Sequence, residues 1–349
     1  MKHVTADDQL KILIASPLEP ELVDRIRAQA PDGFEVVYAP ELLPEPRYPA
    51  DHTGAPRELD PEELDRWHAL LADADVLFDF DWNDRWNLLQ NARKVRWVQA
   101  TSSGIGRFLE RTGMGESGVA FTTAAGVHAV PLAEFAVLGL LYFTKGVPTL
   151  QQRQQERRWE RYATRQLRGG RVTVVGLGAI GREVARLLHA HGVDVVGTAR
   201  TRPDQLPEGV TRFVDNSELA DALQGSDAVV LACPHTDQTH HLIAEKELDA
   251  LGPEGVLVNI ARGPVVDEAA LIEALQQGRL GGAFLDVFEE EPPAADNPLW
   301  QMDNVLVSPH SASTVTAENG LIVDLFIDNL HRFAEGRPMR NQFDPSRSY

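Results

Sequence analysis

The chain has 349 residues, enough for about two domains, and its 43% hydrophobic and 24% charged residues are typical of a globular protein. The formal net charge of -19 disfavours binding to nucleic acid or to an anionic membrane, so we expect neither as a partner. Cys233 is the only cysteine, which excludes an internal disulfide and favours a reducing compartment.

The first residues, Met1–Leu10, lack the apolar core and the cleavage signature of a signal peptide. The longest apolar run, near Phe135–Phe143, is too short to cross a bilayer. We therefore expect a cytoplasmic protein.

Strand-like and helix-like segments alternate in the N-terminal part of the chain. Strands are predicted at 11–15, 34–38, 75–80 and 95–100, and helices at 21–30 and 60–72. The second helix starts with Asp60 as N-cap and Pro61 at its first position. Six prolines between Pro40 and Pro61 predict a long surface loop without regular structure. The alternation implies a parallel sheet covered on both faces.

Two helices are predicted next: an apolar one at Pro131–Tyr142 and a charged, solvated one at Gln151–Gln166. From Arg171 the alternation restarts, with strands at 172–175, 193–198, 228–232, 256–260, 282–287 and 305–308, and helices at 182–191, 217–223, 245–251, 268–277 and 319–335. The sequence therefore predicts an α/β fold with two doubly wound parallel sheets.

A glycine motif, GLGAIG at residues 176–181, stands between a predicted strand and a predicted helix. Gly176 permits the tight turn, Gly178 lets the backbone approach a pyrophosphate, and Gly181 lets the helix pack on the strand. The N–H groups at the helix start, around Ala179 and Ile180, then hold the phosphates. Because the pattern predicts a strand before the motif and a helix after it, dinucleotide binding is favoured over an ordinary Gly-rich turn.

The strand after this motif ends without the acid that usually binds the ribose 2′-hydroxyl. Arg200, Thr201 and Arg202 stand there instead, and a guanidinium is suited to a 2′-phosphate. The sequence thus predicts NADP as the preferred cofactor, with NAD possible. The alternative is that both arginines merely face solvent.

Arg262, Glu291 and His310 each follow a predicted strand of the second sheet. Ligands in open α/β sheets bind outside the carboxyl ends of strands, so these residues can meet in one cleft. Arginine can clamp a substrate carboxylate, and histidine can move a proton while a carboxylate orients it. Taken singly, each is more often a surface or structural residue. Together they supply what the reduction of a 2-oxo acid needs, and we expect no metal site.

With these segments the chain resembles the D-isomer-specific 2-hydroxyacid dehydrogenases. The matching pieces are VVGLGAIGREVARLL, SDAVVLACPHTDQTHHLI, NIARGPVVDEAALIEAL, GAFLDVFEEEPP and NVLVSPHSAS, in the family's order. The resemblance implies Arg262 as the anchor of carboxylate and carbonyl, and His310 as general acid in reduction with Glu291 as its partner. It also implies cofactor roles for Asp286 and for the segment Ala232, Cys233 and Pro234. The backbone at Ser103 and Gly104 resembles the loop that holds the substrate carboxylate.

The resemblance further implies a flavodoxin-like substrate domain at 1–124 and 312–349 and a Rossmann NAD(P)-binding domain at 125–311. The helix Pro131–Tyr142 resembles the family's dimerisation arm, which predicts a homodimer; the alternative is a buried core helix. Phe80, Trp82 and Trp86 can wall the substrate pocket or belong to the core. Glyoxylate, hydroxypyruvate, pyruvate and bulkier 2-oxo acids stay open as substrates. The rivals are a dehydrogenase of formate or phosphite and a dinucleotide-sensing binding protein.

Overall fold

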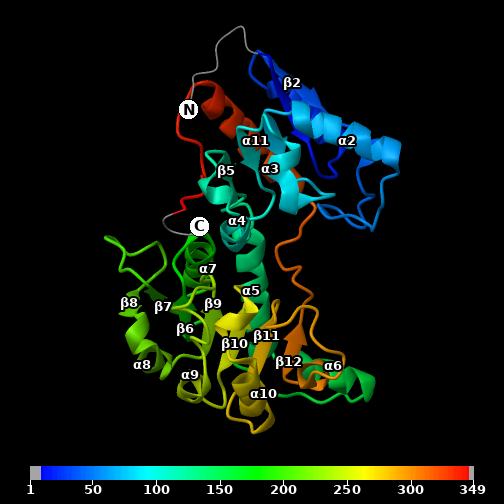
Figure 1. The fold of residues 1–349 in the computed structure, drawn as a ribbon. Helices are drawn as coiled ribbons and strands as arrows, with labels where there is room; N and C mark the ends of the chain where they lie inside the picture. The colour runs from blue at the N-terminus through cyan, green and yellow to red at the C-terminus, as the bar shows by residue number, and fades with distance from the viewer. Residues whose placement is uncertain (1–8, 346–349) are drawn as a thin grey trace. The chain divides into compact units, whose positions relative to one another are not determined.

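Figure 1 shows a computed structural model of the chain, in which residues 9–345 are described. The chain divides into two compact units: unit 1 comprises Met1–Val127 and Thr314–Tyr349, and unit 2 comprises His128–Ser313. The expected boundaries, after residues 124 and 311, lie a few residues earlier. The stretch Met1–Leu10, expected to carry no signal peptide, lies outside the described residues except for its last two.

Unit 1 is built on a five-stranded sheet with the strand order β2-β1-β3-β4-β5, in which every pairing is parallel. Its strands are β1 (Leu10–Ile14), β2 (Phe34–Val37), β3 (Val76–Phe78), β4 (Trp97–Gln99) and β5 (Ala120–Thr122). This is the strand order of flavodoxin-like sheets, as predicted.

Helices cover both faces of this sheet because successive strand residues point to opposite sides. On one face, α1 (Pro20–Gln29) and α11 (Glu318–Ala334) pack on Ile12, Phe78 and Trp97. On the other face lie α2 (Pro61–Asp73), α3 (Leu88–Asn91) and α4 (Gly106–Thr112), which cover Leu13, Leu77 and Val98. The C-terminal helix α11 therefore completes the core that the N-terminal strands begin.

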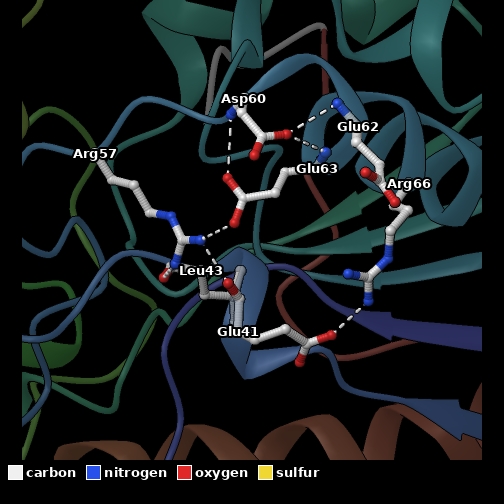
Figure 2. Close-up of polar contacts among 7 residues, drawn as sticks. All are labelled: Glu41, Leu43, Arg57, Asp60, Glu62, Glu63 and Arg66. Atoms are coloured by element: carbon white, nitrogen blue, oxygen red, sulfur yellow. Dashed lines mark hydrogen bonds and ion pairs between the residues drawn. The ribbon is translucent and has the colours of Figure 1, made fainter.

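The proline-rich segment between β2 and α2 is tied to the start of α2. Arg57 donates to the carbonyl oxygens of Glu41 and Leu43, at 2.5 and 2.7 Å, and to the Glu63 carboxylate at 2.8 Å (Figure 2). A capping box begins α2: the Asp60 carboxylate accepts from the Glu63 N–H at 2.9 Å, and Glu63 accepts from the Asp60 N–H at 3.1 Å. These bonds satisfy donors that a helix start leaves open.

Asp51 anchors the middle of the same segment. Its side chain is only 2% exposed and accepts from Nε and Nη2 of Arg47, at 2.6 and 3.0 Å. The backbone N–H groups of Thr53 and Gly54 donate to the same carboxylate. The hydrogen bonds from Arg47, opposed by burial, hold the pKa of Asp51 well below its ordinary value.

Unit 2 carries a seven-stranded parallel sheet with the order β12-β11-β10-β9-β6-β7-β8. Its strands are β6 (Arg171–Val175), β7 (Asp194–Ala199), β8 (Arg212–Asp215), β9 (Ala228–Leu231), β10 (Val256–Asn259), β11 (Gly282–Leu285) and β12 (Val305–Val307). When the strands are numbered from the first strand of the unit, the order is 3-2-1-4-5-6-7, which is the Rossmann order with one added strand. Both halves of the predicted fold class are thus confirmed.

Two helical layers enclose this sheet. One layer contains α5 (Ala129–Thr144) and α7 (Ala179–Ala190), and the other contains α8 (Leu219–Leu223), α9 (Glu245–Leu251) and α10 (Glu268–Gln276). Gly139 of α5 lies so close to Phe284 of β11 that an added Cβ would stand 2.6 Å from the ring. Eight of the sixteen residues of α5 are buried, so one face of this helix belongs to the core of unit 2.

The structure differs from the sequence prediction in several places. The helix predicted at 151–166 is wrong in extent: α6 spans Val147–Gln155, and residues 158–166 have no regular structure. These residues are almost all exposed, so no packing stabilises a helix there. The prediction also omits β5, β8, α3 and α4, and a 3₁₀ turn at Pro40–Leu42 interrupts the predicted loop.

No single helix within residues 9–345 has both the length and the apolar character needed to cross a membrane. The consecutive helices α5 and α6 meet these criteria only when taken together, and they are bent by 60° at the break between them.

Candidate active site

The glycine turn joins β6 to α7 in unit 2. Gly176 has a φ of +96°, which favours glycine, and a Cβ on it would stand 2.7 Å from the Cys233 nitrogen. A Cβ on Gly181 would stand 1.8 Å from the Gly176 oxygen, so close helix–strand packing requires glycine there. Gly178 differs: its φ is -73°, and a Cβ on it would meet nothing within 4 Å. The chain itself therefore does not fill the space above Gly178.

The first turn of α7 adjoins this space. Gly178 is the N-cap and has no side chain to accept from the N–H groups that follow it. The N–H groups of Ala179, Ile180 and Gly181 therefore lack the cap that Asp60 provides to α2. Open space, free donors and the positive end of the helix dipole together fit a pyrophosphate.

The segment after β7 carries the residues predicted to select the cofactor. Arg200, Thr201 and Arg202 are exposed, and the guanidinium of Arg202 lies 5.6 Å from the centre of the Phe213 ring. An acid does stand nearby, because Asp215 on β8 is the register partner of Ala199. Its carboxylate accepts from the backbone and hydroxyl of Ser217, and these bonds lower the pKa of Asp215.

The loop after β9 lies against the glycine turn. Ala232 donates to the Val175 carbonyl at 2.8 Å, Cys233 is buried, and Pro234 is exposed. Burial raises the pKa of the Cys233 thiol to about 12, so the thiol is not a nucleophile near neutral pH. These three residues can line a ligand, but they supply no nucleophile near neutral pH.

Three histidines further along this loop form contacts that the sequence analysis did not anticipate. His235 and His240 approach to 3.2 Å through ring nitrogens, and the rings of His240 and His241 stack at 4.0 Å. His241 Nε2 pairs with Glu289 Oε1 at 2.7 Å. The contacts connect the loop after β9 with the loop after β11. The only sequence signal was the presence of three histidines within seven residues.

Arg262, Glu291 and His310 follow β10, β11 and β12, which are neighbours in the sheet (Figure 1). His310 Nδ1 lies 2.7 Å from Glu291 Oε2, while Glu291 Oε1 accepts from the Phe288 N–H at 3.1 Å. The side chains of His310 and Glu291 are 47% and 38% exposed. The carboxylate therefore fixes one ring nitrogen and leaves Nε2, on the far side of the ring, for a ligand.

Arg262 is exposed at the end of β10, and its Nη1 donates to the Ala261 carbonyl at 2.6 Å. The structure thus pairs Glu291 with His310 directly and sets Arg262 at the same edge of the sheet. Asp286 is only 2% exposed, and its Oδ1 accepts from the Ser308 hydroxyl and from the N–H groups of Ser311 and Ala312.

Ser103 and Gly104 lie in unit 1, exposed in the turn between β4 and α4. The aromatic residues considered for a pocket wall also belong to this unit. Phe80 packs on Phe108 at 5.1 Å, and Trp82 lies 6.3 Å from the buried Trp67. These two rings extend the core, whereas Trp86 is 47% exposed. Its ring packs on Phe108 at 5.3 Å and lies beside Arg85 and Arg111.

Comparison with known proteins adds the family to this geometry. A family model for the "D-isomer specific 2-hydroxyacid dehydrogenase, NAD binding domain" matches residues 137–312, which is half of the chain. The chain belongs to this family. The matched range lies within unit 2, so unit 2 of this 2-hydroxyacid dehydrogenase family member is the NAD-binding domain. It includes every predicted catalytic and cofactor residue and excludes Ser103 and Gly104.

Relatives of known name support the assignment. Over 95% of its length the chain is 30% identical to a D-3-phosphoglycerate dehydrogenase of Archaeoglobus fulgidus, and it spans 59% of that protein. It is also 30% identical to a glyoxylate/hydroxypyruvate reductase of Arabidopsis thaliana, over 72% of this chain and 77% of the relative. A solved D-isomer specific 2-hydroxyacid dehydrogenase from Xanthobacter autotrophicus, in complex with NADPH and MES, superposes with a TM-score of 0.77 at 30% identity, covering 98% of this chain and 100% of that one.

Proposed function

We propose that the protein catalyses hydride transfer between NAD(P)H and a small 2-oxo acid, giving a D-2-hydroxy acid. The observation that carries the proposal is the pair of Glu291 and His310, joined at 2.7 Å and half-exposed at adjacent strand ends. An accessible imidazole held by a carboxylate is the arrangement that general acid–base catalysis needs.

Each residue then has a distinct task. The Arg262 guanidinium anchors the substrate carboxylate and carbonyl. The role of Ser103 and Gly104, which lie in unit 1, in carboxylate binding stays a prediction. His310 Nε2 gives its proton to the carbonyl oxygen in reduction and takes it back in oxidation. Glu291, bonded to Nδ1, keeps the ring oriented so that Nε2 faces the substrate side.

The nicotinamide cofactor, when bound, supplies the hydride that reduction of the carbonyl carbon requires. The glycine turn and the first turn of α7 would hold its pyrophosphate. Ala232, Cys233 and Pro234 would line the cofactor, and Asp286 would help to position the nicotinamide. We propose a preference for NADP, because Arg200 and Arg202 directly follow β7 and because Asp215, the register partner of Ala199, is bonded to Ser217.

A panel of 2-oxo acids with NADPH and with NADH tests the function directly. We expect turnover of glyoxylate, hydroxypyruvate or a bulkier 2-oxo acid, measured by loss of NADPH absorbance. Reduction of NADP by formate or phosphite alone identifies a different dehydrogenase. Cofactor binding without any turnover identifies a sensing protein.

The double variant Arg200→Gln/Arg202→Gln tests the cofactor preference. Each charged hydrogen bond to a 2′-phosphate contributes about 1.5–3 kcal/mol, so kcat/KM for NADPH should fall at least about tenfold. The value for NADH, which lacks that phosphate, should change little. An equal fall with both cofactors, or better wild-type efficiency with NADH, contradicts the preference.

We also propose a homodimer. Val130 and Leu138 on α5, and Leu150 on α6, are large apolar residues that are each about half-exposed. Light scattering at several protein concentrations tests this, and a monomer at all of them contradicts it.

A further inference from the structure

His310 has an unusual backbone conformation. Its φ is +52°, in the left-handed region that residues with a Cβ rarely occupy. Such a conformation persists only where the surrounding structure determines it. The contacts that hold this loop therefore decide where the imidazole lies.

Those contacts converge on Asp286, at the end of β11. The His310 N–H donates to the Asp286 carbonyl oxygen at 2.9 Å. Oδ1 of Asp286 accepts from the Ser308 hydroxyl at 2.6 Å, the Ser311 N–H at 2.8 Å and the Ala312 N–H at 3.0 Å. One buried residue thus binds the chain before, at and after His310.

The same residue begins the loop that ends at Glu291. Two positions after Asp286, the Phe288 N–H donates to Glu291 Oε1, which directs Oε2 toward His310. Asp286 therefore joins the two loops whose side chains form the acid–base pair. Three donors from the loop around His310 thus converge on one buried oxygen of this residue.

Among the three donors to Oδ1, only Ser308 uses its side chain, since Ser311 and Ala312 use their backbone. Ser308 is also fixed by its own N–H, which donates to the Leu285 carbonyl at 2.8 Å. We propose that Ser308 is a positioning residue: through Asp286, its hydroxyl holds His310 in register with Glu291. The proposal rests on the proposed function, and it assigns Ser308 no contact with substrate.

The test compares Ser308→Ala with Ser308→Thr, which keeps the hydroxyl. We expect kcat of Ser308→Ala to fall about tenfold, because small displacements of a catalytic group reduce its effectiveness steeply. The dissociation constant of NADPH should change much less than kcat, since the glycine turn assigned to the pyrophosphate is untouched. Ser308→Thr should recover most of the lost kcat.

The matched control is Ser226→Ala. Ser226 is a buried serine of the same unit whose hydroxyl bonds to the Ala222 carbonyl and to Thr173, away from the Asp286 loops. It should lower the melting temperature without lowering kcat. Should Ser308→Ala fail to fold, Ser308→Cys, with its much weaker donor, carries the same test.

Unchanged kcat in Ser308→Ala, or an equal fall in Ser226→Ala, overturns the positioning role. That result is distinct from failure of the proposed function, in which the wild-type protein itself turns over no 2-oxo acid.

Discussion

Bonded carboxylates occur in both units, but they differ in exposure. In unit 2, Glu291 and its partner His310 are 38% and 47% exposed. In unit 1, Asp51 is 2% exposed beneath Arg47. The first pair can exchange a proton with a ligand, whereas Asp51 is sealed and anchors a loop. A carboxylate held by hydrogen bonds is therefore a candidate for catalysis only where its bonded partner is also exposed to a ligand.

The largest expected effect comes from His310→Ala. Removing a general acid–base group should lower kcat about 10²–10⁴-fold, because water must then donate the proton. NADPH affinity and stability should remain. His189→Ala, an exposed histidine of α7 in the same unit, serves as the control and should keep full activity. A His310→Ala variant with kcat close to wild type would falsify the assignment of His310 as the general acid–base group.

A glycine pair in unit 2 separates ligand binding from packing. Gly178→Ala adds a methyl group that meets no protein atom within 4 Å, so the variant should fold normally. Its NADPH dissociation constant, measured by fluorescence titration, should rise about tenfold or more because the methyl group occupies the pyrophosphate space. Gly181→Ala should instead reduce stability, because its Cβ would stand 1.8 Å from the Gly176 oxygen. Normal NADPH binding by Gly178→Ala would contradict the assignment of the turn.

Asp51→Asn tests whether the buried carboxylate of Asp51 stabilises unit 1. The folded-state pKa of Asp51 lies below its ordinary value of about 3.9, so the ionised carboxylate stabilises the fold above that pH. This stabilisation is lost as the pH falls through the folded-state pKa. Near pH 7, urea unfolding should show a loss of about 1–3 kcal/mol in the variant, and the loss should shrink in acid. NADPH affinity, a property of unit 2, should not change; a pH-independent loss would assign the effect to something other than charge.

The smallest effect concerns the capping box. Asp60→Ala removes the acceptor for the first N–H groups of α2 and should lower the free energy of unfolding by about 1 kcal/mol. Glu62→Gln removes a charge from the same turn but no cap, so it should cost less than about 0.5 kcal/mol. Equal losses in chemical denaturation would mean that the charge, rather than the cap, stabilises the helix.

The fold class could be predicted because buried parallel strands are continuous apolar runs, as in Ala228–Leu231. The β8 strand was not predicted because it is not a continuous apolar run. It forms an edge of the sheet, and only Phe213 and Val214 of its four residues are apolar. The charged stretch after Gln155 misled in the opposite direction, because helix propensity without a buried face does not maintain a helix.

For the candidate site, Glu291 and His310 could be selected from the sequence because each follows a strand that the apolar pattern predicts. It could not predict the bond from Ser308 to Asp286, whose partners are 22 positions apart. That bond depends on β11 and β12 being neighbours and on side-chain rotamers, which periodicity does not specify. The histidine contacts after β9 were missed for the same reason.

Cys233 has a practical consequence. It is the only thiol in the sequence, and burial keeps it protonated. It should therefore not react with maleimide reagents while the protein is folded. A reporter cysteine introduced on the surface of either unit can then be labelled alone, without first removing the native one. Fluorescence or spin-label experiments could in this way follow each half of the protein as nucleotide and oxo acid are added.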